Sequence, residues 1–128
     1  EFFTNAPEGF SAERDAIVRY LNAGGTFIAS AGNNSLDNDS TFRAFPASYN
    51  LPGLISVAAT DNQDALAGFS NFGRTTVALA APGVDVRTTT AAGGYAYVNG
   101  TSFSAPMVTG AVALLKSFRP EMSAAEIR

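Results

Sequence analysis

A serine at the expected start of a helix has the surroundings best suited to chemistry. Ser102 follows Gly100, lies among small residues and precedes an apolar run. The first N–H groups of a helix have no partners within the helix and carry the positive end of its dipole, so they would stabilise an oxyanion beside Ser102. Gly100 would let a substrate approach the backbone closely. We interpret Ser102 as a nucleophile, and a serine that only caps the helix is the alternative.

Asn33 is the second candidate, because it follows a short apolar segment at residues 26–30. This segment is typical of a buried strand in a parallel sheet, and ligands bind beyond the carboxyl ends of such strands. The side-chain amide of Asn33 could there donate a hydrogen bond to a developing oxyanion. An ordinary turn asparagine is the alternative interpretation.

The chain contains no histidine and no cysteine. A serine nucleophile needs a base to take its proton, and histidine is the usual one. We therefore expect this chain to be inactive by itself. The absence of cysteine excludes a disulfide framework and any metal site built on cysteine.

Length and composition indicate one globular domain without a nucleic-acid or membrane partner. The chain has 128 residues, of which 46% are hydrophobic and 15% charged, and its net charge is -3. A negative balance with scattered basic residues disfavours binding to nucleic acid or to an anionic membrane. The apolar runs are also much shorter than a membrane span.

Helical and strand patterns alternate along the chain, which predicts an α/β fold with a parallel sheet. A helix is expected from an N-cap at Ser11 to the glycine pair at 24–25, with these residues on its buried face: Ala12, Ala16, Ile17, Tyr20 and Leu21. Apolar runs predict buried strands at 26–30, 54–59 and 77–81. Residues 1–10 and 45–49 are expected to be loops.

The last third of the sequence predicts a hairpin and then two helices. Alternation over residues 84–90 and 95–98 indicates the hairpin. The helix that runs from about residue 101 or 104 to 117 is apolar around most of its circumference, so we expect it to be central and buried. Ser123 and Glu126 form a capping box two residues before the sequence ends. We therefore expect a truncated domain.

Six segments, in their order along the chain, resemble the subtilisin-like serine proteases, the subtilases. The most specific is the run Asn-Gly-Thr-Ser-Phe-Ser-Ala-Pro-Met-Val-Thr-Gly at 99–110, which is similar to the family's nucleophile signature. The others are Ile-Ala-Ser-Ala-Gly-Asn at 28–33, Phe-Pro-Ala at 45–47, residues 54–61, Phe-Ser-Asn-Phe-Gly at 69–73 and Ala-Ala-Pro-Gly at 80–83. The resemblance covers nearly the whole chain, from about residue 11 to 128.

The resemblance implies a three-layer α/β fold with a mostly parallel sheet flanked by helices. Residues 1–128 would be the C-terminal portion of one catalytic domain. The intact protein would hydrolyse peptide bonds through an acyl-enzyme on Ser102, with the Ser102 N–H and the Asn33 amide as its oxyanion hole. The implied substrate-binding residues are Ser30, Ala31 and Gly32, which would line the pocket and pair with the substrate backbone, Ala47 near the pocket floor, and Asn99 and Gly100, which would position the turn.

The family's catalytic aspartate and histidine lie in its N-terminal half, which this sequence lacks. The implied partners are therefore that half of the domain and a peptide or protein substrate. We also expect the exposed sheet to favour self-association. A pseudoprotease or binding module with the same fold is the alternative function. An unrelated α/β-hydrolase is disfavoured, because Ser104 stands where the nucleophile elbow has its second glycine.

No metal ligands and no cofactor are expected in this segment, and calcium would belong to the intact family fold. Ala78 stands where many members carry an aspartate, which weakens the case for a cation site near it. Other aspartates, among them Asp39 and Asp61, are interpreted as solvated loop carboxylates. Because most bacterial members are exported, the resemblance implies a secreted or extracytoplasmic protein.

Overall fold

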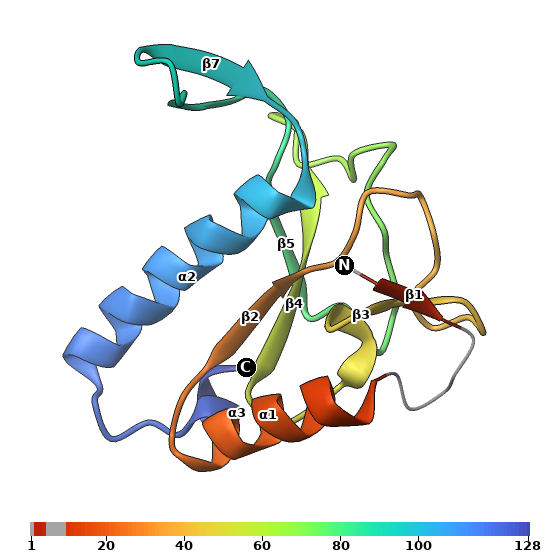
Figure 1. The fold of residues 1–128 in the computed structure, drawn as a ribbon. Helices are drawn as coiled ribbons and strands as arrows, with labels where there is room; N and C mark the ends of the chain where they lie inside the picture. The colour runs from red at the N-terminus through yellow and green to blue at the C-terminus, as the bar shows by residue number, and fades with distance from the viewer. Residues whose placement is uncertain (1, 5–9) are drawn as a thin grey trace.

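The computed structural model describes residues 2–4 and 10–128 and has a parallel three-stranded sheet at its centre. The strands lie side by side in the order β2 (Phe27–Ser30), β4 (Leu54–Thr60) and β5 (Leu79–Pro82) (Figure 1). The register sets Ile28 opposite Ile55 and Val57 opposite Leu79. Because the strands are parallel, the loops that follow them gather at one edge of the sheet, and the loop with Asn33 is one of these.

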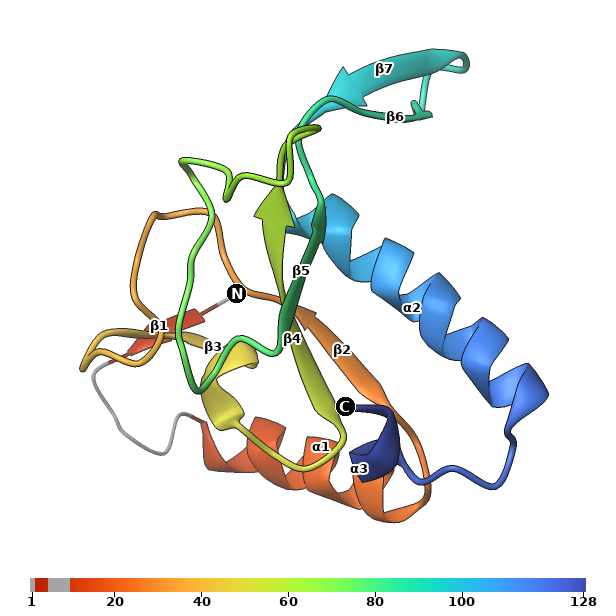
Figure 2. The same ribbon diagram turned by 180° about the vertical axis from the view of Figure 1, so that it is seen from behind.

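The central strand β4 is buried on both faces of the sheet, and its successive residues point to opposite sides. Leu54 packs in a cluster with Ile17 of helix α1 (Ser11–Asn22). Ile55 and Val57 pack instead with Val108 of helix α2 (Thr101–Phe118). This explains why the sequence of β4 is apolar without alternation, and it gives the three-layer α/β architecture that the resemblance implied (Figure 2).

Helix α1 differs in two details from the sequence-based expectation. Its N-cap residue is Phe10, without a side-chain cap hydrogen bond, so the predicted cap at Ser11 is wrong and Ser11 is already helical. Its buried stripe is also narrower than expected. Ile17 is buried, with the side chains of Val18 and Leu21 packed against the same cluster, whereas the other residues expected on this face are exposed: Ala12, Ala16 and Tyr20.

A hydrogen bond joins α1 to the short 3-10 helix η1 (Ala47–Tyr49). The Tyr49 hydroxyl donates to the Glu13 carboxylate at 2.6 Å and thereby ties the first turn of α1 to η1. Burial, together with the Glu13 carboxylate, raises the pKa of Tyr49 to about 12, so this hydroxyl remains a donor at neutral pH.

Two segments that were predicted as loops contain regular structure. Strand β1 (Phe2–Thr4) pairs antiparallel with β3 (Arg43–Phe45), with Phe2 opposite Phe45. Phe45 is fully buried, because it and Tyr49 belong to the core cluster beneath α1. The segment at residues 45–49, which is rich in proline and aromatic residues, is therefore packed in the core and is not an open loop. Residues 1 and 5–9 of the predicted first loop lie outside the described residues.

Helix α2 extends from Thr101 to Phe118, close to the predicted bounds, but only one side of it is buried. One side of the helix covers the sheet (Figure 1), through Val108 among others, whereas Leu114 and Phe118 are 67% and 83% exposed. The prediction of a central, fully buried helix is therefore wrong for this chain. The apolar residues of its outer side have no covering element among the described residues.

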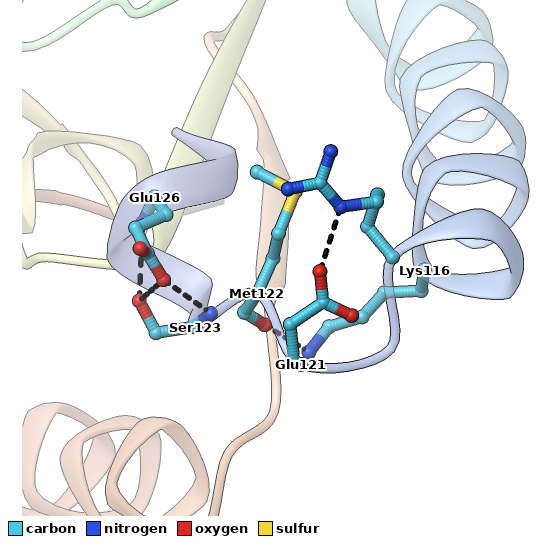
Figure 3. Close-up of polar contacts among 6 residues, drawn as sticks. Lys116, Glu121, Met122, Ser123 and Glu126 are labelled. Atoms are coloured by element: carbon cyan, nitrogen blue, oxygen red, sulfur yellow. Dashed lines mark hydrogen bonds and ion pairs between the residues drawn. The ribbon is translucent and has the colours of Figure 1, made fainter.

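The turn after α2 is closed by polar contacts (Figure 3). The Lys116 ammonium donates to the Met122 carbonyl. The predicted capping box is present at the start of helix α3 (Ala124–Ile127), where the Ser123 hydroxyl accepts from the Glu126 N–H and the Glu126 carboxylate accepts from the Ser123 N–H.

The predicted hairpin is confirmed as β6 (Val86–Thr89) and β7 (Tyr95–Val98), with Val86 opposite Val98. The hairpin projects from the body of the molecule next to the start of α2 (Figures 1 and 2). Strand β5 begins two residues later than predicted, at Leu79, and only Ala81 within it is buried, so the prediction of a buried strand at 77–81 is wrong for most of β5 in this chain. Within the described residues, no helix is long and apolar enough to cross a membrane.

Candidate active site

Ser102 is the second residue of α2 and is exposed to solvent. The N-cap residue before it is Gly100, with φ of 150° and ψ of 151°, a conformation that residues with a side chain rarely adopt. The backbone thus turns sharply into the helix immediately before the serine. Ser102 therefore lies at the end of α2 where N–H groups lack helical partners and the dipole is positive.

Asn33 is brought to the same place by the loop that follows β2. Its side-chain oxygen accepts a hydrogen bond from the Thr101 N–H at 2.9 Å and another from the Thr101 hydroxyl at 3.0 Å. With Oδ1 occupied in this way, the amide nitrogen of Asn33 is the donor that remains available. This nitrogen lies 3.7 Å from the point that a side-chain carbon of Gly100 would occupy, which is an ordinary van der Waals contact. Glycine is therefore favoured at position 100 by its φ of 150° and not by a lack of space.

The Thr101 hydroxyl also accepts a hydrogen bond from the Gly32 N–H at 3.3 Å. Thr101 is fully buried. Its contacts with Gly32 and Asn33 connect the loop after β2 to the start of α2. Its position beside the candidate nucleophile is evident in the sequence, but its contacts join residues that are 68 and 69 positions apart. No local pattern could identify this role.

The end of β5 closes against the same turn. The Gly100 N–H donates to the Gly83 carbonyl at 2.8 Å, and the Ser104 hydroxyl donates to the Pro82 carbonyl at 3.2 Å. A side-chain carbon at Gly83 would lie 2.6 Å from the Ala59 side chain and closer still to the Ser104 hydroxyl. The glycine of the Ala-Ala-Pro-Gly segment is therefore required by this close approach, which holds the start of α2 against the sheet.

Asn99 secures the turn from the hairpin side. Its side-chain oxygen accepts a hydrogen bond from the Asp85 N–H at 2.7 Å. The positioning role expected for Asn99 stays a prediction, and this contact holds its side chain beside the turn. Asn99 itself is exposed, as are Asn33 and Ser102, so these three residues of the candidate set form the solvent-facing part of the site.

The other predicted substrate-binding residues are less exposed in this chain. Ala31 and Ala47 are fully buried, Gly32 is buried, and Ser30 is half-buried. The Ala31 N–H donates to the Val57 carbonyl, and the carbonyls of Ala31 and Gly32 accept hydrogen bonds within the protein. The expected pairing of residues 30–32 with the substrate backbone stays a prediction.

Two buried asparagines near Asn33 were not recognised in the sequence. Asn38 and Asn71 are both fully buried, in segments that were predicted as a polar loop and a turn. Their side chains hydrogen-bond to each other and to the backbone around Asn33. Composition cannot distinguish a buried amide from a solvated one, so only the tertiary contacts reveal them.

Two of the loop aspartates, Asp39 and Asp61, accept hydrogen bonds from neighbouring loop residues. Burial alone would raise the pKa of Asp39, but hydrogen bonds from the side chains and N–H groups of Thr75 and Thr76 outweigh it and lower the pKa to about 2. Asp61 accepts hydrogen bonds from the N–H groups of Gln63 and Ala65 in its own turn. In the described part of the chain, no three acidic side chains gather as metal ligands would.

The geometry brings together the candidate nucleophile and the two candidate oxyanion donors, and these 128 residues contain no histidine to act as the base. The Ser102 hydroxyl, the N–H at the start of α2 and the Asn33 amide belong to one surface, held by Thr101 and by the end of β5. The arrangement can therefore stabilise an oxyanion next to a serine, whereas proton transfer requires a group from outside these 128 residues.

Comparisons with known proteins agree with this geometry. The model of the Subtilase family matches residues 3–128. A thermophilic serine proteinase from Bacillus sp. (strain AK1) is 47% identical over 103 residues, which are 80% of this chain and 24% of that protein. Subtilisin DY from Bacillus licheniformis is 34% identical over 122 residues, which are 95% of this chain and 43% of that protein.

Solved structures show the same fold. A cold adapted subtilisin-like serine proteinase has a TM-score of 0.83 at 27% identity, covering 98% of this chain and 43% of that one. The prenylagaramide maturation protease PagA has a TM-score of 0.79 at 30% identity, covering 98% of this chain and 45% of that one. The chain thus spans less than half the length of each of these relatives.

Proposed function

Because the chain belongs to the subtilase family, we propose that the complete protein is a serine endopeptidase with Ser102 as its nucleophile. The observation that supports this most directly is the contact of Asn33 with Thr101. It sets a side-chain amide beside the positive end of α2, so two different donors flank one exposed serine. A serine that only caps a helix would not need the second donor.

In the proposed reaction, the Ser102 hydroxyl oxygen bonds to the carbonyl carbon of the scissile peptide. The hydroxyl proton passes to a base supplied by the remainder of the domain. The carbonyl oxygen becomes an oxyanion, which accepts hydrogen bonds from the Ser102 N–H and the Asn33 amide. When the C–N bond breaks, the amine leaves with that proton, and water then hydrolyses the acyl-enzyme and restores the Ser102 hydroxyl.

Covalent labelling of the full-length protein tests this proposal. A fluorophosphonate should label the wild type stoichiometrically, and Ser102→Ala should abolish labelling and peptidase activity. Ser117→Ala, which changes an exposed serine at the other end of α2, is the matched control and should leave both unchanged. Undiminished labelling and peptidase turnover in Ser102→Ala would refute the assignment.

A binding module that keeps the fold without catalysis is the second candidate, because the base for Ser102 must come from outside these 128 residues. The two proposals differ in what the rest of the protein must contain. A protease requires an aspartate and a histidine in subtilase contexts in the full-length sequence, whereas a pseudoprotease lacks at least one of them. Reading that sequence and measuring fluorophosphonate labelling distinguish the two.

We further propose that the remainder of the domain covers the outer side of α2. Leu114 and Phe118 are the most exposed large apolar residues of α2, and the chain is less than half as long as its relatives. Burying such side chains stabilises a fold by roughly 1.5–3 kcal/mol for each residue. The isolated chain should therefore self-associate, and sedimentation should detect this. By analogy with the family, we also propose that the complete protein is exported from the cell.

A further inference from the structure

We propose that Asn38 and Asn71 are positioning residues that hold Asn33 in place for catalysis, a role that rests on the proposed function. Neither touches the candidate nucleophile. They form hydrogen bonds with the backbone on both sides of Asn33. These hydrogen bonds connect the turn at residues 69–73 to the loop that carries the candidate oxyanion donor.

Asn71 binds both the residues before and those after Asn33. Its backbone N–H donates to the Gly32 carbonyl at 2.8 Å. Its side-chain oxygen accepts from the Asn34 N–H at 2.9 Å and from the Leu36 N–H at 3.1 Å. The two peptide groups that flank Asn33 are thereby fixed to a single residue.

Asn38 completes the arrangement from the other side of the loop. Its amide nitrogen donates to the Ala31 carbonyl at 2.8 Å, and its side-chain oxygen accepts from the Asn71 amide at 3.2 Å. Its backbone N–H donates to the Phe72 carbonyl at 2.7 Å. The loop at residues 31–38 is therefore joined to the turn at 69–73 by both backbone and side-chain contacts.

The chemistry of the side chain explains why both residues are asparagines. Each uses an amide donor and a carbonyl acceptor at the same time, and both are fully buried with these groups satisfied. An aspartate lacks the donor, and a serine is too short to bridge the same groups. A fully satisfied buried network selects one backbone conformation, because a displaced member would leave polar groups unpaired.

Fixing the backbone matters because Asn33 must be in place before the reaction begins. Thr101 holds the side-chain oxygen of Asn33, and the loop backbone holds the other end of the same side chain. The direction of the amide nitrogen therefore depends on both. A displacement of about 1 Å in a catalytic group can cost roughly a hundredfold in rate. Loosening the loop should therefore reduce transition-state stabilisation and not substrate affinity.

The test uses kinetics of the full-length protein, with active sites counted by fluorophosphonate titration so that unfolded molecules do not contribute. We expect Asn71→Ser and Asn38→Ser each to lower kcat by roughly ten- to a hundredfold, with KM changed less than twofold. Ile17→Val, which alters the core beneath α1 away from this network, is the control and should retain kcat. If Asn71→Ser does not fold, Asn38→Ser decides by the same criteria.

A double-mutant cycle separates positioning from general destabilisation. In an Asn33→Ala background the donor is gone, so adding Asn71→Ser or Asn38→Ser should change kcat less than twofold. An equal loss of kcat in both backgrounds, or full kcat in the single variants, would overturn the proposal. Peptidase activity that survives Ser102→Ala would instead overturn the proposed function, so the two failures are distinguishable.

Discussion

The side-chain oxygen of Asn33 accepts two hydrogen bonds from Thr101, one from its N–H at 2.9 Å and one from its hydroxyl at 3.0 Å. This relationship orients the Asn33 amide, since an amide with its oxygen occupied presents its nitrogen as the free donor. It also connects the loop after β2 to the residue that precedes Ser102. The candidate site is therefore defined by a contact between two elements and not by either element alone.

Replacing Asn33 with alanine should lower kcat about 10²- to 10³-fold while KM changes little, because the lost hydrogen bond forms with the oxyanion. This range is the loss observed when such a donor is removed from a subtilisin, so it is a value carried over from the family. Steady-state kinetics of the full-length protein measures both constants. A loss confined to KM would show that Asn33 binds substrate and does not stabilise the oxyanion.

Thr101→Val should keep the shape of the side chain but remove its hydroxyl. The Gly32 N–H then loses its acceptor in a buried position, which costs about 1–3 kcal/mol in the free energy of unfolding. Asn33 loses one of its two anchors, so kcat should fall about tenfold. Thr101→Ser retains the hydroxyl and should restore most of both quantities. Equal defects in the two variants would argue against a role for this hydrogen bond.

Gly83→Ala should destabilise the protein by about 1–3 kcal/mol, because the added carbon would overlap with Ala59 and the Ser104 hydroxyl. Gly68→Ala is the matched control. Gly68 is exposed with nothing near the added carbon, so this change should alter the free energy of unfolding by less than about 0.5 kcal/mol. Denaturant unfolding, performed in a Ser102→Ala background to prevent autolysis, measures both changes.

Asp39 should make stability depend on pH in the acid range. Its pKa is lowered from the ordinary 3.8 to about 2, so its stabilising effect is complete above pH 3.8 and is lost as the pH falls through about 2. Asp39→Asn should therefore lower the free energy of unfolding at pH 7 by about 1–2 kcal/mol, with allowance for partial exposure of the carboxylate. The stabilities of wild type and variant should converge near pH 2.

Asp15→Asn provides the comparison for this experiment, because Asp15 is an exposed carboxylate on α1. Only Asp39 accepts the hydrogen bonds of Thr75 and Thr76, so Asp15→Asn should not reproduce the loss of stability of Asp39→Asn at pH 7. Urea unfolding monitored at several pH values, again in the Ser102→Ala background, measures the effect. A constant difference between wild type and Asp39→Asn down to pH 2 would contradict the proposed cause.

Local patterns in the sequence were sufficient for most of the elements. The apolar run of β4, the glycine pair after α1, the alternation around Gly93 and the capping box at Ser123 each involve neighbouring residues, and each was confirmed. The order of short segments was likewise enough to indicate the family, which the comparisons confirm. These properties depend on a few consecutive residues and need no knowledge of the rest of the fold.

The errors arose where burial depends on distant residues. The sequence of α2 is apolar on nearly every side, but only its contact with the sheet decides which side is buried in this chain. Phe45 lies in a segment with loop-like composition and is fully buried because it packs with Tyr49 and Ile17. Helical periodicity and turn residues cannot reveal such contacts.

For the candidate site, the sequence by itself identified Ser102 at the start of a helix and Asn33 at the end of a strand, together with the missing base. Only the tertiary structure showed that Thr101 joins the two, that the Ala31 and Gly32 backbone is already occupied, and that Asn38 and Asn71 hold the loop. Residue type and spacing specify which groups are present. Their partners depend on parallel strands that bring residues 68 positions apart to one edge of the sheet.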